Sequence, residues 1–214
     1  MSQPDLLRYE KEAWDSGFFY VAGVDEAGRG PLAGPVVAAA VWMPADTIRE
    51  RVPDRYAGLT DSKQISEKQR EQFFEGLQAD QAVRMGISQV EAPEIDRINI
   101  LQATHRAMRE ALVAVAADYA LVDGLPVAGL PCPSQSIVKG DALSLLIAAS
   151  SVVAKVTRDR EMVRLDQVYP NYGFAQHKGY GTAAHLRALK EHGACPVHRR
   201  SFRPVAERDQ LDLL

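Results

Sequence analysis

The sequence has few cysteines and lacks any long hydrophobic run. Cys132 and Cys195 are the only cysteines among its 214 residues, too few for a disulfide framework, a zinc finger or an iron–sulfur cluster. We therefore expect two free thiols in a reducing compartment. No segment approaches the roughly 20 consecutive apolar residues that a helix needs to cross a bilayer, so we expect no membrane span.

The amino terminus lacks the features of a secretory signal. Residues 8–12 form a charged run, whereas such a signal has a basic start followed by an apolar centre. We therefore expect a cytoplasmic protein. Hydrophobic residues make up 46% of the chain and charged residues 25%, which excludes disorder as its main state. The length of 214 residues predicts one domain with a carboxyl-terminal extension.

The chain is not basic overall, because its formal net charge is −3, but its cations are unevenly distributed. Between residues 176 and 203, six cations and four histidines accompany a single acid, Glu191. This segment could contact a polyanion such as nucleic acid. A solvated helix face with a basic tail explains the same composition equally well, so the cluster only supports a function argued from other residues. The cations are Lys178, Arg187, Lys190, Arg199, Arg200 and Arg203.

Short apolar runs predict the strands of a mixed sheet. The first two runs flank a glycine-rich loop, which is typical of a hairpin, and helical patterns separate most of the later runs. The resulting order, β-β-α-β-α-β-β-α, predicts an α/β domain in which helices flank a mixed sheet. Strands are expected at 20–24, 35–43, 83–87, 119–122 and 136–138.

Three longer patterns have the periodicity of helices. Residues 66–69 have the sequence of a capping box, and the helix behind them is expected to end near Asp80. A second, long helical pattern begins at Pro93 and extends to Val115. A third, rich in alanine, is continuous over residues 143–168.

Acidic residues follow three of the predicted strands at the point where each ends. These residues are Asp25 with Glu26, then Asp123, then Asp141. Strands entered through crossover helices run parallel, which brings their carboxyl ends to one edge of the sheet. Acids gathered there repel one another unless cations occupy the site, and Mg²⁺ and Mn²⁺ prefer carboxylate oxygens. The pattern indicates a divalent-metal site suited to phosphoryl chemistry.

Each acid has a simpler explanation when it is taken alone. Aspartate is common in turns and at helix N-caps, and Asp141 is a plausible N-cap. Three strand ends that each deliver an acid are harder to explain in this way. Asp25 and Glu26 are adjacent, so regular strand geometry directs their side chains to opposite faces. Either the strand is irregular there, or Glu26 partly uses its backbone oxygen.

Asp159 competes with Asp141 for the fourth position in this acidic group. The two residues are 18 positions apart, which corresponds to about 27 Å along a continuous helix. Only one of them can therefore reach the metals. We expect it to be Asp141, because that residue adjoins a strand end.

A series of motifs extends over nearly the whole chain, from about Tyr20 to Val205. The longest is GVDEAGRGPLAGPV at 23–36. The others are DSK at 61–63, VDG at 122–124, VKGD at 138–141, AASSVVAKVTRD at 148–159, YGFAQHKGY at 172–180 and HRRSF at 198–202. In content and order, this series resembles bacterial ribonuclease HII, a type 2 ribonuclease H.

The resemblance implies a ribonuclease H-like fold with a helical carboxyl-terminal extension. It also implies a four-acid metal site made of Asp25, Glu26, Asp123 and Asp141, with Mg²⁺ or Mn²⁺ as cofactor. The implied activity is hydrolysis of the RNA strand of RNA–DNA hybrids and nicking of duplex DNA on the 5′ side of an embedded ribonucleotide. The products carry 3′-hydroxyl and 5′-phosphate ends. These nucleic acids are the expected partners, and we expect a monomer.

The resemblance further implies a set of substrate-binding residues. The glycines of Gly28-Arg29-Gly30 let the backbone approach a sugar closely, and the resemblance assigns this loop to recognition of the 2′-hydroxyl. A tight hairpin would account for the glycines but not for Arg29. Tyr180 is assigned to the next sugar, although without the resemblance it would be expected in the core. The phosphate contacts are assigned to Ser62, Lys63 and Lys155, although exposed lysines are mostly solvated.

We divide the chain into an amino-terminal segment (1–17), a catalytic domain (18–168) and a basic extension packed on the same domain (169–214). Two other functions are weighed against the nuclease. An ATPase is disfavoured because the glycine loop precedes a strand and lacks the G-x-x-x-x-G-K-S/T pattern. A non-catalytic hybrid-binding module is disfavoured because no acid is missing.

Overall fold

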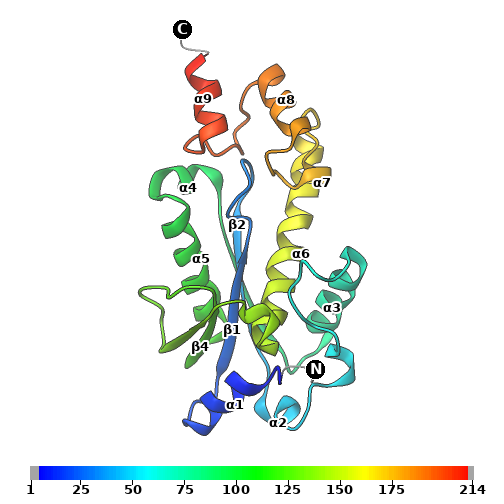
Figure 1. Cartoon of the computed structure of the whole chain (residues 1–214), viewed down its shortest axis with the longest axis vertical. Coiled ribbons are helices and arrows are strands. Elements are labelled where there is room, and N and C mark those ends of the chain that lie inside the picture. Colours follow the sequence, from blue (N-terminus) through cyan, green and yellow to red (C-terminus); the bar gives the residue numbers. More distant parts are fainter. Residues whose placement is uncertain (1–4, 212–214) are drawn as a thin grey trace.

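The computed structural model describes residues 5–211, with side chains as far as Arg208 (Figure 1). Its strands are β1 (Val21–Ala27), β2 (Val36–Trp42), β3 (Arg84–Val90), β4 (Tyr119–Asp123) and β5 (Ser134–Ile137). They form one sheet in the order β3-β2-β1-β4-β5. The pairs β1–β2 and β2–β3 are antiparallel, while β1–β4 and β4–β5 are parallel. The predicted hairpin and the mixed sheet are confirmed.

The three parallel strands bring their carboxyl ends to one edge of the sheet. Val24 of β1 lies beside Val122 of β4, and Asp123 at the end of β4 lies beside Ile137 of β5. The acids that follow these strands are therefore carried to the same edge, as the order of strands and helices predicts.

Helices cover both faces of the sheet (Figure 1). On one face lie α6 (Leu145–Val168) and α3 (Glu67–Ala79), and on the other lies α5 (Ile100–Val115). Adjacent residues of β1 accordingly belong to different buried clusters, because strand side chains alternate between faces. The shorter elements are α1 (Arg8–Asp15), α2 (Ala45–Ile48), the 3₁₀ turn η1 (Asp54–Tyr56), α4 (Ala92–Ile98), the 3₁₀ turn η2 (Gly140–Ala142), α7 (Phe174–His177), α8 (Ala183–His192) and α9 (Arg203–Leu211).

A glycine sets the close approach of α6 to β1. A Cβ atom on Gly23 would lie 2.1 Å from the backbone carbon of Leu146, so only glycine allows this contact. The Ser150 hydroxyl donates a hydrogen bond of 2.9 Å to the Gly23 carbonyl across the same contact. Helix α6 is thereby held against the strand that carries the first two acids.

The helical pattern over residues 93–115 is two helices rather than one. The break is at Asn99, whose φ of 70° places it in the left-handed region. Its side-chain oxygen accepts a hydrogen bond of 3.0 Å from the backbone amide of Gln102 and caps α5. Asparagine tolerates positive φ better than most residues, and the apolar periodicity continues across the break and conceals it.

The other two helices are close to their predicted bounds. The capping box of α3 is confirmed, since the Ser66 hydroxyl accepts from the Gln69 amide while the Gln69 side chain accepts from the Ser66 amide. Helix α6 begins at Leu145 rather than at residue 143, because the Ser144 hydroxyl caps it. Asp141 lies in η2 and is not an N-cap of α6.

Both terminal segments pack onto this core. Leu7, which immediately precedes α1, and Trp14, which lies within α1, belong to the same buried cluster as residues of α6. In the extension, Tyr172 and Phe174 stack and form a smaller cluster with Cys195. Both cysteines are free thiols, as expected. Within residues 5–211, no helix is both long enough and apolar enough to span a membrane.

Candidate active site

Three aspartates meet at the carboxyl edge of the parallel strands. Asp25 comes from β1, Asp123 from the end of β4 and Asp141 from η2. Each offers one carboxylate oxygen, and these oxygens lie within 4.8 Å of one another. Asp123 is fixed by a hydrogen bond of 2.7 Å that its Oδ1 accepts from the Gly140 amide, so β4 and η2 are joined at this point.

The three carboxylates form an electrostatically unfavourable group. Burial, followed by repulsion from Glu26 and Asp123, raises the pKa of Asp25 well above its ordinary value. Burial and the charges of Asp123 and Asp61 raise the pKa of Asp141 to about 6. A bound cation would relieve this repulsion. An all-oxygen donor set of this kind fits a hard divalent metal ion.

Glu26 lies beside this group but faces the other way. The pairing of β1 with β2 stays regular through Glu26 and Ala27, so the strand has no irregularity that would turn both acids to one side. The Glu26 carboxylate is 3.3 Å from Arg29 Nη1, and it borders a cavity on the α5 side that Asp123 also lines. The structure therefore places Glu26 next to the three aspartates but not among them.

Asp159 does not reach the acidic group. It lies on α6, where its Oδ1 accepts a hydrogen bond of 2.6 Å from Lys155 Nζ. The structure thus brings Asp141, and not Asp159, to the other aspartates. Lys155 is therefore paired with a carboxylate, and it also lines a cavity that Asp25 borders.

The predicted substrate-binding residues line a single cavity beside the acids. Asp25 and Glu26 line it too, as do Ser151 and Arg158 of α6. We call this cavity the groove. It brings together segments from four parts of the chain, which sequence separation alone does not predict. The predicted residues that line it are Gly28, Arg29, Gly30, Ser62, Lys63, Lys155 and Tyr180.

The surroundings of Tyr180 and Ser62 differ sharply. Tyr180 is 46% exposed and is not the core tyrosine that its position alone suggested. Its ring lies across from Gly30, where a Cβ would be 3.8 Å from Tyr180 Cε1. Ser62 is buried, and its hydroxyl accepts a hydrogen bond of 2.9 Å from the Ser151 hydroxyl.

Two further residues at the site escaped the sequence analysis. Asp61 lies next to Asp141 and raises the pKa of that carboxyl. It belongs to the motif at 61–63, in which only Ser62 and Lys63 were assigned a role. Ser151 donates to the Ser62 hydroxyl and lies within hydrogen-bond reach of Asp25. The sequence did contain a signal for Ser151, which is one of two adjacent serines in an alanine-rich helical stretch. Hydroxyl groups on a buried helix need a polar partner, so such residues point to a polar site.

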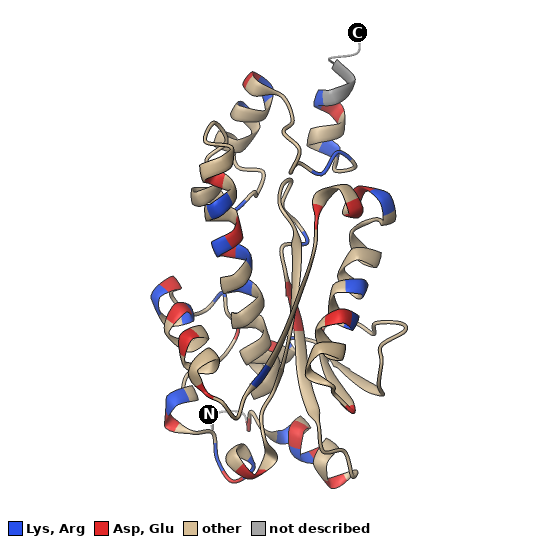
Figure 2. Ribbon diagram, turned by 180° about the vertical axis from the view of Figure 1, so that it is seen from behind, with Lys and Arg blue, Asp and Glu red and all other residues tan. Residues whose placement is uncertain are grey.

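The basic segment does not form one exposed cationic face. Arg199 is fully buried, and its guanidinium donates to backbone carbonyls, so the expectation that it could meet a polyanion is wrong. His185 and His198 are buried as well and hydrogen-bond to each other at 3.0 Å. Figure 2 shows that α8 and α9 carry charges of both signs. The segment's cations are thus divided between the interior and a mixed surface.

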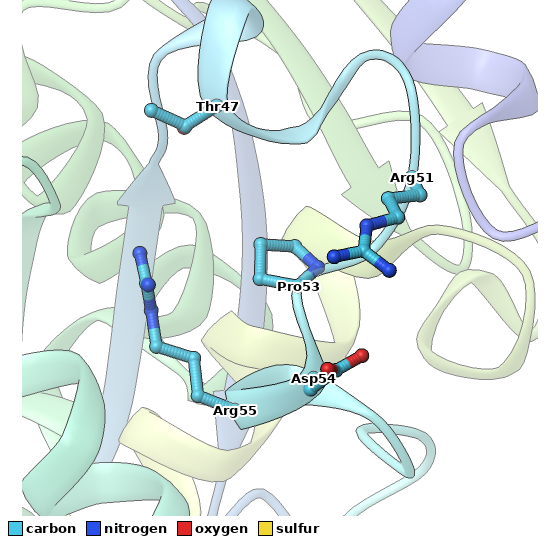
Figure 3. Close-up of a pocket in the computed structure, with 5 residues that line it drawn as sticks. All are labelled: Thr47, Arg51, Pro53, Asp54 and Arg55. Carbon is cyan, nitrogen blue, oxygen red and sulfur yellow. The ribbon is translucent and has the colours of Figure 1, made fainter.

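Another cavity lies between α2 and η1, away from the acids. Figure 3 shows its lining, in which Arg51 and Arg55 lie on opposite sides of Pro53. None of the predicted site residues borders it, and Asp54 accompanies the two arginines. The acidic group and the groove therefore define the candidate active site.

Comparison with known proteins agrees with this geometry. The sequence model of the family described as Ribonuclease HII matches residues 22–205. The chain belongs to the ribonuclease HII family. It is 49% identical over 211 residues to Ribonuclease HII of Desulfitobacterium hafniense, covering 98% of this chain and 77% of that one. It is 50% identical over 209 residues to that of Geobacter metallireducens, covering 97% and 94%.

Solved structures share the fold. The ribonuclease H2 of Pyrococcus horikoshii OT3 superposes with a TM-score of 0.71 at 28% identity, covering 89% of this chain and 97% of that one. The predicted ribonuclease H-like fold is confirmed. As a member of the ribonuclease HII family, the protein is a divalent-metal-dependent endoribonuclease that acts on RNA–DNA hybrids.

Proposed function

We propose that this enzyme hydrolyses the RNA strand of RNA–DNA hybrids and also nicks duplex DNA on the 5′ side of an embedded ribonucleotide, leaving 3′-hydroxyl and 5′-phosphate ends. The observation that carries this proposal is that the lining of the groove includes Asp25, which is one of the three clustered aspartates. A strand whose sugar lies against the loop 28–30 would have its phosphate near the carboxylates.

We assign the metal ligands to Asp25, Asp123 and Asp141, with Glu26 completing the set from the other side of β1. Bound Mg²⁺ or Mn²⁺ would polarise the scissile phosphate and activate the attacking water. The protein's own contribution is to hold the carboxylates at fixed positions, and the Gly140 amide does this for Asp123. Which of the two ions serves in the cell is decided by availability as much as by this oxygen-rich site.

The groove residues supply substrate recognition in this proposal. The backbone of Gly28-Arg29-Gly30 contacts the 2′-hydroxyl, which can both donate and accept a hydrogen bond. The exposed Tyr180 ring packs on the following sugar. The phosphates are contacted by Ser62, Lys63 and Lys155.

We further propose a cytoplasmic monomer in which residues 18–168 form the catalytic domain and residues 169–214 an extension of it. Within the amino-terminal segment, 1–17, residues 5–17 are proposed to support the domain rather than to contact substrate. The core contacts of Leu7 and Trp14 support this assignment.

The decisive experiment compares three duplexes of one sequence: an RNA–DNA hybrid, a DNA duplex with a single ribonucleotide, and an all-DNA duplex. With Mg²⁺ or Mn²⁺ we expect cleavage of the first two and none of the third. The nick is expected on the 5′ side of the ribonucleotide, and chelation of the metal is expected to abolish it. Cleavage of the hybrid without any nicking at the single ribonucleotide would refute the second activity.

A further inference from the structure

Two arginines are buried behind the loop 28–30. Arg158 on α6 is 1% exposed and Arg199 in the extension is 0% exposed. Their hydrogen-bond acceptors are backbone carbonyls rather than carboxylates. Buried cations are costly unless polar groups surround them, so this arrangement calls for a reason beyond packing.

Arg199 holds the carbonyls of the loop itself. Its Nη2 donates to the Gly28 carbonyl at 2.6 Å, and its Nη1 donates to the Arg29 carbonyl at 2.9 Å. Its Nε donates to the Gly34 carbonyl at 3.0 Å. One planar guanidinium thus holds two successive peptide groups of the loop and the Gly34 carbonyl shortly before β2. A lysine ammonium cannot do this with the same geometry.

Arg158 supports the same loop from α6. It donates to the carbonyls of Ala33 and Pro35 at 3.2 and 3.0 Å, and to that of Lys178 at 3.0 Å. A Cβ atom on Gly28 would lie 1.9 Å from Arg158 Nε, so the loop backbone packs directly on this guanidinium. The contact with Lys178 also ties the loop to the segment that carries Tyr180.

The carbonyl contacts determine where the amides point. In a trans peptide group the N–H lies opposite the C=O. Because the carbonyls of Gly28 and Arg29 point toward Arg199, the amides of Arg29 and Gly30 point away from it, and both of these residues line the groove. Within the described part of the chain, neither amide donates a hydrogen bond. Successive free amides of this kind bind an oxygen that accepts hydrogen bonds.

The burial of both arginines comes at a free-energy cost. Burial, followed by the charge of Arg158, lowers the pKa of Arg199 to about 9. Burial likewise lowers the pKa of Arg158. An apolar side chain could fill the same space without this penalty, but it would leave the loop carbonyls without donors.

We propose that Arg199, supported by Arg158, is a positioning residue that orients the Arg29 and Gly30 amides and so sets the discrimination between ribonucleotide and deoxyribonucleotide. This inference rests on the proposed function, in which the loop contacts the 2′-hydroxyl. Sites built to hydrogen-bond a hydroxyl discriminate strongly only while their polar groups are held in place. Arg199 does not line the groove, so it need not touch the substrate for this effect.

The test measures binding with and without the hydroxyl. Dissociation constants are determined for a duplex with one ribonucleotide and for the all-DNA duplex, in Ca²⁺ under conditions verified to give no cleavage. In Arg199→Lys we expect the preference for the ribonucleotide to fall about tenfold, equivalent to about 1.4 kcal/mol. Affinity for the all-DNA duplex is expected to stay within about twofold, because phosphate contacts are unchanged. A general loss of structure would instead weaken both.

A matched control is available on α6. Arg164 is exposed and paired with Glu161, so Arg164→Lys is expected to change neither dissociation constant. Arg158→Lys is the second test variant and is expected to lower the same preference. A folded Arg199→Lys protein that keeps the full preference would overturn the proposal. If the parent enzyme itself shows no preference for the ribonucleotide, the proposed function fails instead.

A measurement on the parent enzyme covers the case in which Arg199→Lys does not fold. Guanidinium protons held by three carbonyls rotate and exchange slowly, and they can be observed by ¹⁵N-edited NMR. We expect the Nη protons of Arg199 and Arg158 to be resolved and protected, unlike those of Arg164. If they exchange as fast as those of Arg164, the loop carbonyls are not held in this way and the proposal is wrong.

Discussion

At the scale of single residues, the three clustered aspartates share one proposed role, as metal ligands, but each has different surroundings. Asp25 is buried, Asp123 accepts a hydrogen bond from a backbone amide, and Asp141 lies next to the carboxyl group of Asp61. These differences predict unequal effects of substitution, since a carboxylate fixed by the backbone can be neutralised without moving.

Asp123→Asn is expected to nearly abolish cleavage while leaving duplex binding comparable. The amide keeps the acceptor for the Gly140 amide but removes the charge that holds the metal. The loss is expected to exceed about 100-fold, the effect typical of a misplaced ligand or of a group supporting one. Single-turnover cleavage at saturating Mg²⁺ measures it, and activity within tenfold of the parent would remove Asp123 from the metal site.

The choice of Asp141 over Asp159 makes a separate prediction. Asp141→Asn is expected to reduce cleavage much more than Asp159→Asn, because only Asp141 lies with the other aspartates. The Asp159 variant keeps an acceptor oxygen for Lys155 but removes the charge of its partner, so it is expected to alter substrate binding only slightly. Both are compared under the conditions used for Asp123→Asn, and the reverse order of effects would show that the fourth acid is Asp159.

Tyr180→Ala tests recognition of the sugar. We expect it to lose more activity on a single ribonucleotide in DNA than on a long hybrid, because in the hybrid any register offers a 2′-hydroxyl. Both substrates are cleaved side by side and expressed as ratios to the parent enzyme. Equal losses would indicate that the ring only packs on Gly30 and does not select the substrate.

At the scale of elements, α6 organises the site, and a carboxylate of α1 is buried at its amino end. Glu10 is 0% exposed and accepts hydrogen bonds from the Ser144 hydroxyl at 2.7 Å and the Leu146 amide at 3.0 Å. Its Oε2 has no hydrogen-bond partner among the described residues. Burial raises the pKa of Glu10 from 4.5 to about 7, so the native state favours the protonated side chain.

This raised pKa predicts a pH dependence of stability. The native state binds the Glu10 proton more tightly than the unfolded chain does, so this protonation adds to the free energy of unfolding. The added stability is fully present below about pH 4.5 and is lost as pH rises through about 7. Glu10→Gln keeps an acceptor oxygen and cannot ionise. Above pH 7 we expect its free energy of unfolding to exceed that of the parent by up to about 3 kcal/mol.

Urea unfolding of both proteins at pH 5 and pH 8 provides the measurement. Other raised carboxyls, such as Asp141, titrate equally in parent and variant, so the difference between the two isolates Glu10. An identical change in stability for both proteins between these pH values would mean that Glu10 ionises normally.

At the scale of the whole molecule, the protein is acidic but its substrate is a polyanion, so binding must depend on a small number of local cations. The net charge is −3, and the structure leaves Arg29 and Lys63 as exposed cations lining the groove. Arg199 is unavailable to phosphates because it is buried. Binding is therefore expected to weaken with salt, but less steeply than for a protein with a continuous basic face.

Lys63→Ala is expected to reduce the slope of log K against log salt by about 0.9, the value for one lost phosphate contact on B-form DNA. Lys68→Ala is the matched control, because Lys68 is exposed nearby on α3 but does not line the groove. An unchanged slope for Lys63→Ala would mean that this lysine is merely solvated.

The sequence by itself determined the features that depend on neighbouring residues or on strand order. The capping box at Ser66 involves residues three positions apart, and the placement of Asp123 and Asp141 follows from parallel strands that share one edge. The groove residues were named only through family resemblance, because Tyr180 and Gly30 lie far apart in the chain. Sequence separation carries no information about such contacts.

Only the tertiary structure decided the environments of single charged groups. Arg199 belongs to a basic cluster by composition, yet its partners Gly28 and Gly34 lie more than 160 positions away and remove it from solvent. Glu10 lies in a charged run but is buried against α6 for the same reason. Burial and partner choice are properties of packed elements, and they set pKa and accessibility more strongly than residue type does.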